Sequence, residues 1–148
     1  MPEHHLLNLD SLPSAFDPCP ECGDVMCQPD PRGEDCDDRA RRRQAVATLK
    51  DQRRQAHALA APAAAARARY KRLARRDEPH PDLVPALEEA IRLSCQRRDL
   101  LERIATDSEA LARANTAHPE HATLARRAAD DRAAVEACHD VDRLRLSR

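Results

Sequence analysis

Four cysteines near the start of the chain have a spacing typical of metal-binding knuckles. In the pattern C-x2-C-x4-C-x8-C they are Cys19, Cys22, Cys27 and Cys36. A C-x2-C pair places two sulfur atoms on one tight loop, at the separation that a tetrahedral ion requires. Both glycines of the chain lie in the same stretch, where they permit turns that other residues disfavour. The pattern predicts a structural zinc ion held by four thiolates.

Other uses of these thiols stay open at this point. Residues 1–38 carry ten acids and one base, so the cysteines could be unligated in a disordered acidic loop. An iron–sulfur cluster or a redox-active disulfide would use the same residue type, and His4 or His5 could replace one ligand. Because protein atoms would fill all four positions, a catalytic zinc with an open water site is not expected.

The cysteine segment also resembles a known family. The strings Cys19-Pro-Glu-Cys22-Gly23 and Cys36-Asp-Asp-Arg39, with Cys27 and Gly33 between them, resemble the small CPxC-type zinc-binding domain of actinobacterial and phage proteins. That family has a histidine where this chain has Cys36, and the match covers residues 19–39 only. The resemblance implies zinc binding by the four cysteines, suggests DNA binding, and points to an origin in a phage or mobile element.

A strongly basic block follows the cysteines. Residues 39–76 contain thirteen bases and one acid. At about 100° per residue, ten of these cations fall within an arc of roughly 140° on one side of a helix. They are Arg39, Arg42, Arg43, Lys50, Arg53, Arg54, Arg67, Lys71, Arg72 and Arg75. Such a surface suits contacts to phosphate groups. The alternative interpretation is that these side chains are solvated or pair with acids of the later helices.

Aromatic residues are nearly absent, since Phe16 and Tyr70 are the only two. Base stacking therefore cannot contribute, and any nucleic-acid binding is expected to be electrostatic and weakly sequence-specific. Membrane attachment is not expected, because the face opposite the cations is mostly alanine and lacks bulky anchors. No apolar run resembles a signal peptide or a membrane span, so a cytoplasmic location is expected.

The elements that must position these residues are all helical. We expect an N-terminal arm and zinc knuckle over residues 1–38, then an antiparallel helical hairpin, three-helix bundle or coiled coil over residues 39–148. The expected helices cover residues 38–76, with a kink at Pro62, then 83–115 and 119–146. Their expected buried positions are Ala45, Leu49, Ala56, Leu59, Ala63, Ala66, Tyr70 and Leu73, then Leu83, Leu87, Ala90, Ile91, Leu100, Leu101, Ile104 and Leu111, then Leu124, Ala128, Val135, Cys138 and Val141.

Three functions compete on this evidence. The leading hypothesis is a zinc-stabilised, non-enzymatic helical protein that binds nucleic acid through the basic helix. The second is a structural or adaptor protein, a coiled-coil hairpin that oligomerises, or binds a protein partner, through its Leu/Ala seam, with zinc purely structural. In the part of that seam on the first helix, Gln52 is the polar exception. The third is a thiol redox sensor. An enzyme is not expected, because no Ser/His/Asp set, phosphate loop or carboxylate pair is evident, and Cys95 and Cys138 resemble small buried hydrophobes.

Overall fold

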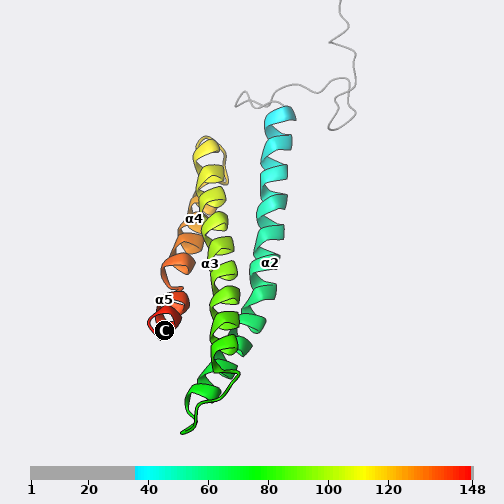
Figure 1. Ribbon diagram of the computed structural model, residues 1–148. Helices are drawn as coiled ribbons and strands as arrows, with labels where there is room; N and C mark the ends of the chain where they lie inside the picture. Colours follow the sequence, from blue (N-terminus) through cyan, green and yellow to red (C-terminus); the bar gives the residue numbers. More distant parts are fainter. Residues whose placement is uncertain (1–35, 148) are drawn as a thin grey trace, which may run out of the picture. The chain divides into compact units, whose positions relative to one another are not determined.

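The computed structural model describes residues 36–147, which form four helices and no strand (Figure 1). The expected all-α fold is confirmed for this range. The helices are α2 Cys36–Ala74, α3 Leu83–Ala114, α4 His121–Glu136 and α5 Asp140–Arg145. The predicted arm and the cysteines that precede Cys36 lie outside the described residues.

The chain divides into two compact units, Met1–Gln44 and Ala45–Arg148. The first nine residues of α2 belong to the first unit. The remainder of α2 and the three later helices form the second unit, which contains all of the buried apolar residues described below.

Helix α2 has the charge distribution that stabilises a long helix. Asp37 and Asp38 lie in its first turn, and Lys71 and Arg72 lie in its last turn. Negative charge near the N-terminus and positive charge near the C-terminus both interact favourably with the helix dipole. Pro62 lies inside α2 at an exposed position, so the expected helix is one element and is not divided at the proline.

The expected seam of α2 is the side that packs on the other helices. Leu49, Ala56 and Ala63 are buried at intervals of seven residues, and Tyr70 continues the same spacing as a half-buried residue. A strict seven-residue spacing keeps one side of a helix turned towards its neighbour. Because the spacing continues beyond Pro62, the two halves of α2 present the same side to α3.

Helix α3 lies between α2 on one side and α4 and α5 on the other (Figure 1). Two apolar clusters hold this arrangement together. The first joins α2 and α3 and contains Leu49, Ala56, Leu100, Ile104 and Leu111. The second joins α3 to α5 and contains Leu87, Ala90 and Leu144, with half-buried Ala66, Tyr70 and Ile91 against it.

The single helix expected over residues 119–146 is wrong, because the chain forms α4 and α5 with a break at residues 137–139. At the break, the amide of Cys138 donates to the carbonyl oxygen of Val135 at 3.0 Å, in the tighter pattern that often ends a helix. The chain then turns onto α3, where Cys138, Val141 and Leu144 are buried. Burial of these apolar side chains offsets the loss of helical hydrogen bonds at the break.

Small side chains allow α3 and α4 to pack closely. Ala105, Ser108 and Ala112 on α3 are buried, as is Ala128 on α4, and these two helices pack against each other. Residues without a long side chain let two helix backbones come near each other, so that many weak dispersion contacts form. The close approach depends on the small volume of each of these positions.

This packing gives a test by overpacking. Replacing Ala105, which is fully buried, by leucine inserts three carbon atoms between helices that have no space for them. We expect A105L to lower the free energy of unfolding by about 1–3 kcal/mol. The matched control is A110L, the same substitution at an exposed position of the same helix. Urea unfolding followed by circular dichroism measures both, and equal stability of the two variants would contradict the close packing.

Candidate anion-binding groove

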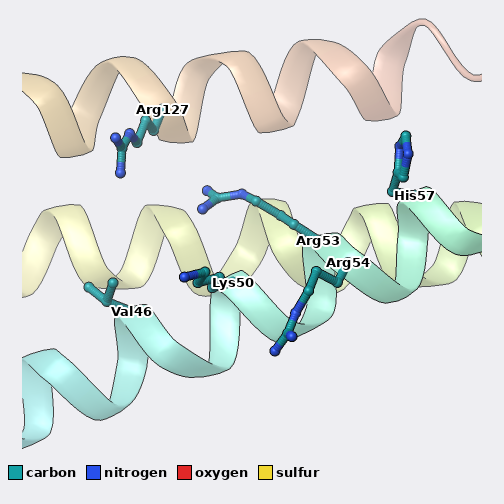
Figure 2. A pocket seen from close by; sticks show the side chains of 6 residues that line it. All are labelled: Val46, Lys50, Arg53, Arg54, His57 and Arg127. Carbon is teal, nitrogen blue, oxygen red and sulfur yellow. The ribbon is translucent and has the colours of Figure 1, made fainter.

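A groove of about 430 Å³ lies between α2 and α4 in the second unit (Figure 2). It is lined by Val46, Lys50, Arg53, Arg54 and His57 of α2 and by Arg127 of α4. Four of these six residues are cations, and none of the described residues that line the groove is acidic. A concave surface lined by one sign of charge concentrates the field and attracts counter-ions of the opposite sign.

Helical periodicity explains why α2 contributes five lining residues. Relative to Val46, the others follow at intervals of four, seven, eight and eleven residues, which fall on one side of an α-helix. This side is adjacent to the buried seam, because Lys50 directly follows the buried Leu49. The lining residues are therefore turned partly towards α4 and partly towards solvent.

Arg53 spans the groove and fixes one of its walls. Its Nη2 donates to Asp131 Oδ2 of α4 at 2.6 Å, and its Nε donates to Asp131 Oδ1 at 3.4 Å. The carboxylate of Asp131 is 17 % exposed, and the Arg53 side chain is 36 % exposed. Two parallel hydrogen bonds from one guanidinium to one carboxylate set the orientation as well as the distance. The pair thus holds α4 at a defined distance from α2.

The other cations of the groove are more accessible. Lys50, Arg54 and Arg127 are exposed. Figure 2 shows Arg127 extending from α4 towards α2 and Arg53 extending from α2 towards α4, whereas Arg54 points away from α4. Arg54 Nη2 donates to Asp51 Oδ1 at 3.0 Å, but the two side chains are 72 % and 56 % exposed. A surface ion pair of this kind contributes little and is easily exchanged for another anion.

The ten cations predicted from the sequence are not equivalent. Arg67, like Arg53, faces the other helices: its Nη1 lies 3.3 Å from both Asp140 Oδ2 and the buried Ser94 Oγ. These two arginines fit the alternative interpretation, in which cations of the first helix pair with acids of the later ones. Five others are exposed in the second unit, and they are Lys50, Arg54, Lys71, Arg72 and Arg75.

The three remaining predicted cations, Arg39, Arg42 and Arg43, lie in the part of α2 that belongs to the first unit. There Arg39 Nη2 donates to Cys36 Sγ at 2.8 Å. A guanidinium donor beside a sulfur atom favours the thiolate form, which is the form that ligates a metal. The other predicted ligands, Cys19, Cys22 and Cys27, lie outside the described residues. Among residues 36–147, no group of three side chains is placed to hold a metal ion.

Sequence reasoning missed Arg127 and His57 as lining residues. Arg127 lies in a segment with no excess of basic residues, so a search for basic runs passes over it. The residues that neighbour Arg127 in the sequence nevertheless indicate where its side chain lies. Arg127 directly precedes the seam residue Ala128 and lies one helical turn before Asp131, which places it at the edge of the packed side of α4.

Comparison with protein-family models, with curated proteins and with solved structures found no match. The resemblance of residues 19–39 to the CPxC-type zinc-binding domain therefore stays a prediction. In the part of the chain that the structure describes, no helix combines the length and the apolar character that crossing a membrane would require.

Helix α4, which carries Arg127, is fastened to α3 by Arg132. Its guanidinium donates to Glu109 at 2.8 and 3.1 Å and to Glu102 Oε1 at 2.7 Å. The hydrogen bonds from Arg132 lower the pKa of the Glu109 carboxyl. A carboxyl group with a lower pKa in the folded state than in the unfolded state stabilises the folded state. The stabilisation is complete at pH values above the pKa of the unfolded state, and it is lost as the pH falls through the pKa of the folded state.

We therefore expect E109Q to lower the melting temperature at neutral pH by a small amount, because the groups are partly exposed and the pair is screened by solvent. The difference from the unmodified protein should shrink as the pH falls below the ordinary glutamate pKa of about 4.3 and through the lowered pKa of the folded state, because the carboxyl then becomes protonated in both states. Thermal unfolding of both proteins at several pH values measures the difference in melting temperature. E88Q, which removes an exposed carboxylate of the same helix that makes no hydrogen bond to Arg132, is the control for the loss of one negative charge.

Proposed function

We propose that this chain is a non-enzymatic helical protein that binds nucleic acid through the phosphate backbone. The observation that carries the proposal is the groove between α2 and α4, where Lys50, Arg53, Arg54 and Arg127 gather with no acidic side chain among the described lining residues. Phosphate groups are the anions that such a cluster suits, because arginine donates two parallel hydrogen bonds to them.

The exposed cations extend beyond the groove, which favours a polymer over a small anion. Lys71, Arg72 and Arg75 lie at the far end of α2 and are exposed. A small anion would occupy the groove alone, whereas a nucleic acid presents phosphates along its whole length. None of the residues that line the groove is Phe, Tyr or Trp, so contacts to bases contribute little and the expected binding is weakly sequence-specific.

The adaptor hypothesis gains less support from the packing. It relies on the Leu/Ala seam, of which the heptad positions of α2 are part, as a binding surface for another chain. Leu49 and Ala56 of that seam belong to an apolar cluster with Leu100, Ile104 and Leu111 of α3 in the same chain. Since the seam is occupied within the chain, it provides no free apolar stripe of the size that a stable interface needs.

Charge reversal tests the nucleic-acid proposal. We expect the triple variant K50E/R54E/R127E to bind a DNA duplex at least about tenfold more weakly than the unmodified protein at low salt. The slope of the logarithm of the binding constant against the logarithm of the salt concentration should also be less steep for this variant. The difference should be up to about 0.9 for each phosphate that the variant no longer neutralises. Fluorescence anisotropy with a labelled duplex measures both quantities.

The control is R103E/R113E/R143E, which changes the net charge by the same amount at exposed positions outside the groove. It should retain most of the affinity and the steep salt dependence. Equal losses of affinity in the two triple variants would mean that only net charge matters, and unchanged binding by the groove variant would remove the proposal. Circular dichroism verifies that both variants keep their helix content.

We further propose that the four cysteines hold a structural zinc ion. Cys36 supports this at the one ligand position within the described residues, because its Sγ accepts a hydrogen bond from Arg39. Purified, reduced protein should contain about one zinc per chain, and C19S/C22S should contain almost none. C95S, which changes a cysteine on α3, is the control and should keep the metal. Elemental analysis distinguishes zinc from iron, and metal-free protein would contradict the assignment.

A further inference from the structure

The exposed cations of α2 in the second unit form two groups separated by an interval without lysine or arginine. The first group is Lys50 and Arg54, beside the groove, and the second includes Lys71, in the last turn of α2, and Arg75, directly after the helix ends. Residues 55–66 between the groups contain eight alanines and no lysine or arginine. The cations are thus placed to make two separate contacts rather than a continuous strip.

The two groups occupy the same positions of the heptad. Lys50 directly follows the buried Leu49, and Lys71 directly follows the half-buried Tyr70, which is 21 residues further along. Arg54 lies four residues after Lys50, and Arg75 lies four residues after Lys71, so this second pair of cations is also separated by 21 residues. Arg75 is the residue directly after the end of α2. Since the buried positions keep their spacing across Pro62, both groups lie on the same side of α2.

The distance between the groups follows from helix geometry. At 1.5 Å per residue, Lys50 and Lys71 are separated by at most about 31 Å, the rise of a straight helix over this interval. One turn of B-form DNA advances about 34 Å, so the same strand returns to the same side of the duplex at nearly this interval. The long side chains of lysine and arginine cover the difference of about 3 Å.

We infer that α2 lies along a DNA duplex and that its two cation groups contact phosphates of one strand about one helical turn apart. The inference rests on the proposed function and specifies its ligand as double-stranded DNA. The alanines between the groups face the intervening groove, where a helix without charged side chains makes no phosphate contact. A single strand is not favoured, because neither group includes an aromatic side chain on which bases could stack.

Duplex length provides the test. A duplex of about 7 base pairs reaches only one group, whereas one of about 14 base pairs reaches both. We expect the affinity of the unmodified protein to rise at least about tenfold between these lengths, well beyond the increase that additional overlapping sites provide. K71E/R75E should still bind the short duplex through Lys50 and Arg54, more weakly than the unmodified protein because one of the two groups is lost, and should not show the rise, whereas R103E/R113E should keep it.

The outcomes separate this inference from the proposed function. If no duplex binds at low salt, the proposed function itself is wrong. If duplexes bind but affinity increases only smoothly with length, or if K71E/R75E keeps the step, the placement of α2 along one turn is wrong. Equal affinity for single-stranded DNA of the same length, or the same step with duplex RNA at higher affinity, would overturn the assignment of the ligand as B-form DNA.

Discussion

The seven-residue spacing of buried positions along α2 determines most of what this chain presents to solvent. The side of α2 that carries Leu49, Ala56 and Ala63 faces α3. This contact fixes the rotation of the helix about its axis, and so it determines which of the remaining α2 residues face solvent. Gln52 shares this side and donates to Asp107 Oδ2 of α3 at 2.8 Å, which sets the two helices at one position along their axes. A polar pair of this kind at a seam favours a single alignment over a slipped one.

The contact between α2 and α3 also determines which cations of α2 pair with acids of other helices and which are exposed to solvent. Arg53 and Arg67 lie at the edge of the seam and therefore meet acids of the later helices, Asp131 and Asp140. Lys50 lies further round the helix, where no helix covers it, and it is exposed. Both kinds of cation carry the same charge, so their difference arises from the angle at which the helix presents them. The number of basic residues alone does not distinguish an arginine that forms an ion pair between helices from a basic residue that is exposed and accessible to an anion.

Periodicity made much of the fold predictable. The all-α class and the buried seam of α2 followed from residue types and spacing, since alanine and leucine at heptad positions leave few other packings. The break at residues 137–139 was not predictable in the same way, because it depends on a tertiary gain, the burial of Val141 and Leu144 against α3. The groove was partly predictable: its α2 residues lie in the basic block, whereas Arg127 joins them only because the fold brings α4 to the other side of the groove from α2.

A thin core has a consequence for how ionic strength acts on this chain. Alanine buries little apolar area, so the second unit depends more than usual on close backbone approach and on cross-helix pairs such as Arg53–Asp131 and Arg132–Glu109. Salt screens exposed pairs more than sheltered ones. Asp131 is mostly sheltered, whereas Arg54 is exposed, so rising salt screens the exposed cation before it loosens the pair between the helices. If the proposed nucleic-acid binding is lost at moderate salt, the helices are therefore expected to remain packed.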